Sequence, residues 1–390
     1  MKHFENNFRT LFTVIVCLFC SISSPAQTEE ENKMDSVEIG LVTCSPHEEV
    51  YSLYGHSAIR LKDTRHNLDC IFNYGEFNFK TPHFALRFVF GKTDYMLGAA
   101  PTMPFLMYYK EWGSQVTEQV LNLTAEEKQD IINSLFTNYS PENRIYRYNF
   151  FYDNCSTRPR DIIERNLRGK IVYEPRTGYE PSYREMINEK TKHHPWATFG
   201  NNILLGINAD RRTTQREQHF LPENLRYDFS RAVIDRDSVK VPLVKETRQL
   251  VAPGVQIIEE DFPLTPLQCS ILLLIVSLAV LAYEQKKKIT ARWYDVILML
   301  LTGLGGLALF VMIFSEHPAT SINLQIMVFN PLSLFFIWKV WKGRKTVWFH
   351  ISLILTIAFF IGGFWQDYAE GMEIVALCLL TRYLRHYNDK

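Results

Sequence analysis

Long apolar stretches fill the last third of this 390-residue chain, and they constrain its fold more than any other feature. A helix needs about 20 mostly apolar residues to cross the ~30 Å hydrocarbon core of a bilayer. The five expected spans are Leu264–Tyr283, Trp293–Phe314, Leu324–Trp341, Val347–Phe364 and Tyr368–Leu384. Glu373 and Arg382 weaken the last of them. The sequence therefore predicts an all-α membrane domain of about five transmembrane helices.

The basic residues of the loops set the expected orientation. Lys and Arg cluster after the first, third and fifth spans, whereas the loops after the second and fourth contain neither. Because basic loops stay in the cytoplasm, the polar part of the chain is expected outside. We expect a multi-pass protein of the cytoplasmic (inner) membrane with its polar domain on the external, periplasmic side.

The N-terminus agrees with this orientation. A weakly basic start precedes the short apolar run Leu11–Phe19 and the small residues of Ser24-Pro25-Ala26. This order is typical of a cleaved secretory signal peptide, with an uncleaved anchor as the alternative. We divide the chain into a signal peptide (1–26), an external domain (27–238), a linker (239–262) and a membrane domain (263–390).

Charge and ligand patterns exclude several classes of function. The chain has 42 basic and 42 acidic residues, so it lacks the basic excess typical of nucleic-acid binding. His193 and His194 are adjacent, but no Cys or carboxylate set accompanies them at metal-ligand spacing. We expect no nucleic acid, no metal and no cofactor.

The cysteines of the external domain supply the candidate chemistry. They are three in number, Cys44, Cys70 and Cys155, and an odd number in an oxidising compartment leaves at least one thiol unpaired within the chain. Cys44 and Cys70 lie in short β-like runs and are able to form a disulfide with each other. Cys155 would then be the remaining free thiol.

Cys155 lies at the expected start of a helix that runs through Arg160–Leu167. Pro159 fits only in the first turn, which places the start between Cys155 and Thr157. The unpaired N–H groups and the dipole at a helix start stabilise a thiolate, the nucleophilic form of cysteine. The same N–H groups, with Asn154 or Ser156, are candidates for an oxyanion hole.

His56 is the expected general base for Cys155. It stands in Tyr54-Gly55-His56-Ser57, directly before a short strand, where a ring at a strand edge is accessible from a cleft. A base of this kind needs a third polar group to orient its ring. Asn73 on the next strand is favoured, and Tyr54 is the alternative.

The external domain is expected to be α+β. Alternating patterns predict strands at Val37–Cys44, Ser57–Leu61, Asp69–Tyr74 and Gln115–Leu123, and a capping box at Thr124 opens a helix to about Thr137. A His that precedes the Cys reverses the order of papain and matches circularly permuted papain-like folds. The aromatic segment Phe84–Tyr109 is either an ordinary core or a surface that rests on the bilayer or admits an acyl chain.

Several motifs together resemble a lipoprotein N-acyltransferase or intramolecular transacylase family, over most of the mature chain. They are Thr43-Cys44-Ser45-Pro46, Tyr54-Gly55-His56-Ser57-Ala58-Ile59-Arg60, Phe72-Asn73-Tyr74-Gly75, Asp153-Asn154-Cys155-Ser156-Thr157, Leu205-Gly206 with Ala209-Asp210-Arg211, Phe220-Leu221-Pro222, and Ser315-Glu316-His317-Pro318 with Asn323 and Asn330-Pro331.

The resemblance implies transfer of a fatty acyl chain to the α-amino group of a lipoprotein's N-terminal cysteine. His56 would be the base and Cys155 the acyl carrier, with lipoproteins and membrane lipids as partners. The donor would be a phospholipid or the lipoprotein's own diacylglyceryl group.

Polar residues near the outer ends of the second and third spans are a second candidate site. Polar groups at membrane depth usually face a partner or a cavity. They would hold a lipid headgroup or substrate, or else serve as helix caps and interhelical contacts; they are His317, Asn323, Gln325 and Asn330.

Two other functions fit the same residues. A membrane-anchored cysteine amidase or peptidase would use the same pair against cell-wall peptides, with water as the acceptor. A sensor or assembly factor would instead keep Cys155 buried and inert.

Overall fold

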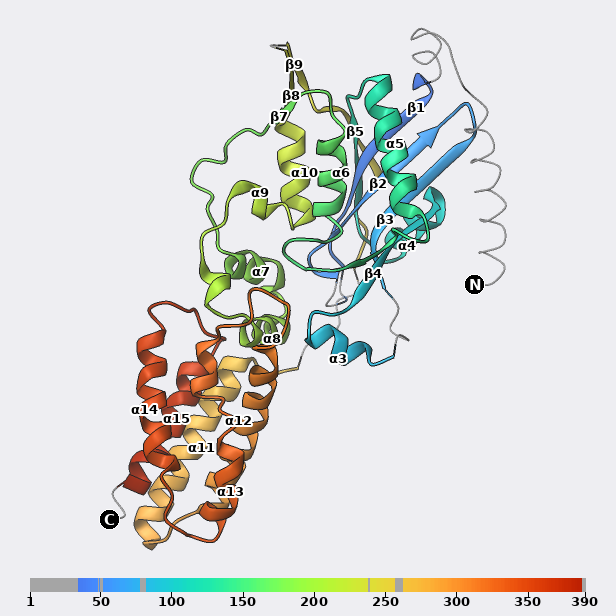
Figure 1. Ribbon diagram of the computed structural model, residues 1–390. Coiled ribbons are helices and arrows are strands. Elements are labelled where there is room, and N and C mark those ends of the chain that lie inside the picture. Colours follow the sequence, from blue (N-terminus) through green and yellow to red (C-terminus); the bar gives the residue numbers. More distant parts are fainter. Residues whose placement is uncertain are drawn as a thin grey trace.

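The computed structural model describes residues 34–47, 49, 52–77, 82–237, 239–256 and 262–387. The predicted signal peptide lies outside these residues. An α+β domain stands above a bundle of long helices, and short helices join the two (Figure 1). The expected α+β domain followed by a helical region is therefore confirmed, whereas its papain-like ancestry stays a prediction.

An antiparallel sheet of seven strands forms the centre of the external domain. Its spatial order is β10-β5-β1-β2-β3-β4-β6. The strands are β1 (Val37–Cys44), β2 (His56–Asp63), β3 (Leu68–Glu76), β4 (Asp94–Pro101), β5 (Val116–Leu121), β6 (Ile145–Arg147) and β10 (Val244–Val251). The four strands expected from alternating patterns are all present in this sheet.

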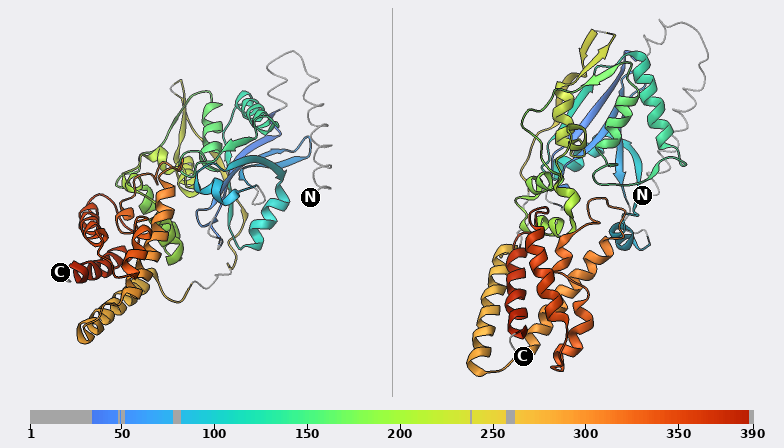
Figure 2. Two further views of the ribbon diagram at one scale, coloured as in Figure 1. Left: turned by 60° about the horizontal axis from the view of Figure 1, so that its bottom comes forward. Right: turned by 60° about the vertical axis from the view of Figure 1, so that its left-hand side comes forward.

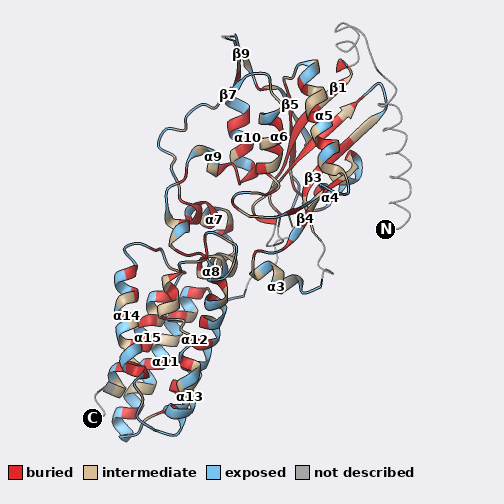
Figure 3. Cartoon of the chain, in the orientation of Figure 1, coloured by how far each residue is buried: buried red, intermediate tan, exposed pale blue. Residues whose placement is uncertain are grey.

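Alternation of side chains gives the sheet two buried faces. Leu41 and Ile59 share one core with the helices α5 (Ala125–Tyr139), α6 (Thr157–Arg165) and α10 (Pro222–Arg231). Val42 and Ala58 point to the opposite face, where α4 (Thr102–Glu111) covers them. Figure 3 shows the sheet buried between these layers. The Thr124 capping box opens α5 as expected, with Glu127 as its partner.

The two faces explain why the suggested disulfide is absent. Cys44 and Cys70 are both free and buried. Cys44 belongs to the core under α4, whereas Cys70 belongs to the core under α5 and α6. Both cysteines lie in strands, as predicted, but these strands direct the two thiols to opposite sides of the sheet.

The predicted linker is corrected over its first half. Residues 239–251 form strands: β9 (Val239–Pro242) joins β7 (Lys170–Val172) and β8 (Val233–Arg236) in a small sheet, and β10 pairs with β5 at the edge of the large one. The polar, charged composition of β10 is that of an exposed edge strand, which resembles a linker when read locally.

The membrane part is a bundle of five helices, which lie side by side below the external domain (Figure 2). They are α11 (Pro266–Lys287), α12 (Arg292–Met312), α13 (Ser333–Trp341), α14 (Trp348–Gly362) and α15 (Met372–Tyr387). Only α11 and α12 are, among the described residues, long and apolar enough to span a bilayer by themselves.

The third expected span is broken. A 3-10 turn (η3) covers Leu324–Met327, and α13 begins only at Ser333. Pro331 lacks an N–H and disfavours helical backbone in the residue before it, so a helix does not run through this point. Five crossings therefore stay a prediction.

Short helices and loops hold the two domains together. They include α7 (Tyr183–Thr191) and α8 (Pro195–Leu204), with a 3-10 turn η2 (Ile207–Asp210). Gly206 N–H donates to Ala319 O at 2.7 Å, and Ile207 N–H donates to Ile322 O at 2.8 Å. A Cβ on Gly206 would lie 2.1 Å from Ile322 O, so this backbone contact requires glycine.

Candidate active site

The structure brings Cys155, His56 and Asn73 to one place. Cys155 lies two residues before the start of α6, which packs on β2, while His56 opens β2 and Asn73 lies on β3. A Cβ added to Gly75 would lie 3.5 Å from Cys155 Cβ and 4.0 Å from His56 Cε1. The Cys and His side chains therefore meet beside Gly75, whose φ of +101° favours glycine.

Asn73, the residue favoured as the orienting group, is hydrogen-bonded to the His56 ring. Its Oδ1 lies 2.5 Å from His56 Nε2 and accepts the proton of that nitrogen. Nδ1 is then the ring nitrogen left to exchange a proton with Cys155. The alternative, Tyr54, is wrong: its hydroxyl accepts a hydrogen bond from Asn201 Nδ2 at 2.8 Å, and its ring packs on Phe150.

The pKa values distinguish Cys155 from the other two external cysteines. Burial raises the pKa of Cys70 to about 12 and holds the pKa of Cys44 well above its usual value. Burial also opposes ionisation of Cys155, but the charge and hydrogen bond of His56 and two backbone N–H groups lower its pKa below the ordinary value. Only this thiol of the three is prepared to ionise.

The contact with Cys155 also shifts the pKa of His56. Burial alone would lower the pKa of His56, but the charge and hydrogen bond of Cys155, Asn73 and the Glu76 carboxylate raise it. A lowered thiol pKa beside a raised imidazole pKa favours the thiolate–imidazolium pair. Both side chains are partly exposed, so a substrate can reach them.

Glu76 is a member of the site that the sequence did not reveal. Its Oε1 accepts from Asn73 Nδ2 at 3.3 Å, which orients the amide so that Oδ1 faces His56. Burial raises the pKa of Glu76, opposed by Asn73 and His56. Gly98 on β4 makes room for this carboxylate, because a Cβ there would lie 2.0 Å from Oε1. In the sequence, the position of Glu76 directly after Gly75 was the signal that could have identified it as a member of the site.

The candidate oxyanion donors are corrected in part. Asn154 Oδ1 accepts from the backbone N–H groups of Ser156 and Thr157, and its Nδ2 donates to Phe150 O and Phe220 O. Asn154 is thus a cap of α6 with no donor left for substrate. The Ser156 hydroxyl is buried and has no hydrogen-bond partner among the described residues, so it stays a candidate.

Two backbone N–H groups are further candidates for the oxyanion hole. Those of Ser57 and Cys155 itself are directed at the Cys155 sulfur and contribute to its lowered pKa. Donors that stabilise a thiolate lie close to the carbonyl oxygen of an acyl group attached to that sulfur. Ser57 was not predicted, although it follows the base directly in sequence.

Aromatic side chains form one wall of the site. Tyr95 on β4 stacks on Tyr148, with ring centroids 4.1 Å apart. Burial, followed by the nearby Cys155 charge, raises the pKa of Tyr95 to about 12. The guanidinium of Arg158 lies 3.5 Å from the centre of the neighbouring Tyr146 ring. This wall offers Cys155 an apolar side and a polar rim.

The four polar residues of the membrane part all make hydrogen bonds within the protein. His317 Nε2 lies 3.1 Å from Phe88 O in the external domain, and Asn330 Oδ1 accepts from Leu332 N–H at the turn before α13. Asn323 Nδ2 donates to Ile203 O, and Gln325 Nε2 donates to Asn202 O. The alternative reading, caps and contacts between elements, is what the structure shows.

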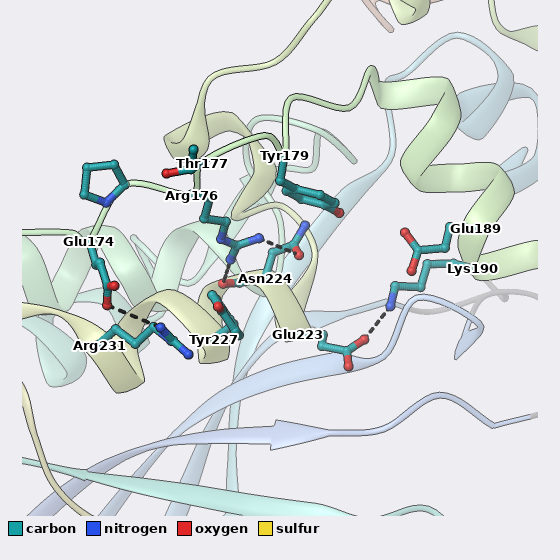
Figure 4. A pocket seen from close by; sticks show the side chains of 11 residues that line it. Glu174, Arg176, Thr177, Tyr179, Glu189, Lys190, Glu223, Asn224, Tyr227 and Arg231 are labelled. Carbon is teal, nitrogen blue, oxygen red and sulfur yellow. Dashed lines mark hydrogen bonds and ion pairs between the residues drawn. The ribbon is translucent and has the colours of Figure 1, made fainter.

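A polar cavity of about 580 Å³ lies elsewhere on the external domain, between α7, α10 and residues 174–179 (Figure 4). Its charges are mostly paired within the cavity: Glu174 with Arg231, and Glu223 with Lys190. Neither Cys155 nor His56 lines it. We therefore place the candidate chemistry at Cys155 and not in this cavity.

Comparison with known families decides the relationship of the chain. Residues 24–188 match the model described as the Lnb N-terminal periplasmic domain, and residues 257–390 match the model described as the Lnb transmembrane domain. The chain belongs to the Lnb family. This confirms the lipoprotein N-acyltransferase-like family that the motifs indicated. The family member is a membrane protein with a periplasmic domain, and that domain carries the Cys155 site. No curated protein and no solved structure matches the chain.

Proposed function

We propose that this protein is a cysteine-dependent acyltransferase that moves a fatty acyl chain through a Cys155 thioester to the α-amino group of a lipoprotein's N-terminal cysteine. The observation that carries the proposal is the contact of Cys155 with His56, in a member of a lipoprotein-processing family. Opposed pKa shifts prepare this thiol, alone among the external ones, for nucleophilic attack.

In the first half-reaction, the Cys155 thiolate attacks the carbonyl carbon of a lipid ester. The N–H groups of Ser57 and Cys155 stabilise the oxyanion, and each such donor contributes about 3 kcal/mol to transition-state stabilisation. The carbon–oxygen ester bond breaks, and the His56 imidazolium gives its proton to the leaving alkoxide. The products are the Cys155 thioester and a lyso-lipid.

In the second half-reaction, the α-amine of the lipoprotein attacks the thioester carbonyl. His56, now neutral, takes the proton from the attacking nitrogen, and the carbon–sulfur bond breaks to restore the thiolate. The Asn73–Glu76 pair holds the ring in one orientation through both steps. The ester donor is either a phospholipid or the diacylglyceryl group of the lipoprotein itself.

The experiment is to replace Cys155 and read the acylation state of a lipoprotein. Cys155→Ala should leave the N-terminal amine of the lipoprotein free in intact-mass analysis, and no acyl adduct should form on the enzyme. Cys269→Ala is the matched control, because this partly exposed thiol lies in α11, away from the site. Normal acylation by Cys155→Ala would refute the proposal, and cell-wall peptides cleaved only when Cys155 is present would favour an amidase.

A further inference from the structure

The short helix α3 (Phe84–Val89) exposes apolar side chains at an unusual place. Leu86 is 59% exposed and Phe88 50% exposed, although both belong to the water-facing domain. Figure 1 shows α3 at the lower edge of that domain, beside the upper end of the helical bundle. The two residues are two positions apart and point to different sides of the helix, so what they contact depends on where α3 lies relative to the membrane.

Hydrogen bonds fix α3 to the outer end of α12. Ser315 Oγ donates to Val89 O at 2.7 Å, and Glu316 N–H donates to Phe90 O at 3.0 Å. Ion pairs reinforce the contact, since Arg147 reaches Glu316 at 3.2 Å and Asp94 at 3.0 Å. The position of α3 along the bundle axis is therefore set by α12.

The length of α12 places this contact at the membrane surface. Its 21 residues rise about 30 Å, which is the thickness of the hydrocarbon core. Exposed aromatic side chains mark both ends of the bundle, as in the belts of membrane proteins. Trp293 and Trp338 lie at the basic end, and Phe314, Phe364 and Trp365 lie at the end that faces the external domain.

We propose that α3 is an interfacial helix that inserts Leu86 and Phe88 into the outer leaflet and leads a lipid acyl chain from the bilayer to Cys155. The occupant of this surface is a bilayer lipid, because the end of α3 is hydrogen-bonded to Ser315, directly after the exposed apolar residues Ile313 and Phe314 at the outer end of α12. The route to Cys155 rests on the proposed acyl transfer, whereas the membrane contact does not.

The chain that follows α3 supplies the route. β4 begins at Asp94, and its Tyr95 forms the aromatic wall of the site together with Tyr148. An acyl chain lifted from the leaflet over α3 would therefore meet aromatic surface before it meets the thiolate. Of the alternatives for the segment Phe84–Tyr109, α3 fits the bilayer surface, while β4 fits the core through Tyr95 and Leu97.

Photocrosslinking tests the membrane contact without any need for catalysis. The full-length protein carries p-benzoylphenylalanine at position 86, is reconstituted in phosphatidylethanolamine–phosphatidylglycerol vesicles, and is irradiated. The matched control carries it at position 239, because Val239 is 62% exposed on β9, at the far end of the external domain. We expect lipid adducts at position 86 and few at position 239, and equal yields would overturn the proposal.

A second measurement tests the route. Leu86→Asp should slow thioester formation from vesicle lipid at least tenfold, equivalent to about 1.4 kcal/mol, because an apolar side chain is lost from the leaflet. Alkylation of Cys155 by iodoacetamide should stay unchanged, and Val239→Asp should behave like the wild type. Wild-type transfer by Leu86→Asp would overturn the route. Strong lipid crosslinking without any thioester would instead refute the acyl transfer and leave the membrane contact standing.

Discussion

Cys155 and His56 each stabilise the charged form of the other, and the Glu76 carboxylate adds to the stabilisation of the His56 imidazolium. The thiolate exists above the lowered pKa of Cys155, and the imidazolium exists below the raised pKa of His56. Both shifts widen the pH window in which the thiolate and the imidazolium coexist. Removal of either partner narrows that window from one side.

The pH dependence of Cys155 alkylation measures this window. In the wild type we expect the iodoacetamide rate to rise at a pH below ~8.5, the usual pKa of a thiol. His56→Ala removes the stabilising charge and leaves burial, so the midpoint should move above that value. Glu76→Gln should produce a smaller upward shift, because a less basic His56 holds less charge.

Gly98→Ala supplies the matched test of Glu76. It leaves the charge in the protein but displaces the carboxylate from Asn73, since the added Cβ would overlap it. We expect it to act on the alkylation profile in the same direction as Glu76→Gln. Identical profiles in the wild type, His56→Ala and Glu76→Gln would contradict the thiolate–imidazolium pair.

Local sequence was sufficient to identify Cys155, His56 and Asn73, because a helix start and a strand edge leave recognisable patterns. Glu76 holds the Asn73 amide and also raises the pKa of His56 by its charge, and Gly98 makes room for it from a neighbouring strand. Such relations depend on how strands pair, which no local pattern records. The direction in which the Asn154 side chain points was not predicted for the same reason, since one of its hydrogen-bond partners is the distant Phe220 O.

At the level of elements, α6 depends on Asn154 for its first turn. Asn154→Ala removes the cap of Ser156 and Thr157 and leaves two carbonyl groups without their donor. A lost cap costs about 1 kcal/mol, and each buried unpaired polar group costs about 1–3 kcal/mol more. We expect a clear fall in Tm by calorimetry, together with slower alkylation of Cys155.

Asn133→Ala is the control, because Asn133 lies exposed on α5 and accepts one hydrogen bond, from Gln129. Its Tm should stay close to that of the wild type. If Asn154→Ala were as stable as Asn133→Ala, the capping role would be wrong.

The third apolar stretch shows what hydropathy cannot predict for an element. Leu324–Trp341 has the composition of a span, but Asn330 and Pro331 interrupt its backbone before α13. Composition records whether side chains tolerate lipid, and it carries no information on where backbone hydrogen bonds stop. The strands were predicted correctly, because the alternation of apolar and polar residues shows directly which side chains are buried.

For the whole molecule, the junction at Gly206 decides whether the site stays in place above the membrane. Gly206→Ala would force the two backbone segments apart, because the added Cβ would overlap Ile322 O. This oxygen belongs to the backbone and cannot move aside as the end of a flexible side chain could. We expect a lower Tm and a marked loss of lipoprotein acylation, with Cys155 alkylation retained. Gly200→Ala on α8 is the control, since its Cβ would meet no atom within 4 Å. Full acylation by Gly206→Ala would show that the domains need no rigid junction.

The position of β10 has a consequence for how the protein matures. This last strand of the sheet lies directly before the membrane domain, and it covers β5, all six of whose residues are buried. While the chain is being exported, the sheet cannot be completed until the segment next to the first membrane helix has emerged. Until then β5 presents an open edge, which is a template for aggregation. The order of synthesis thus couples completion of the sheet that carries His56 to the arrival of α11 at the membrane.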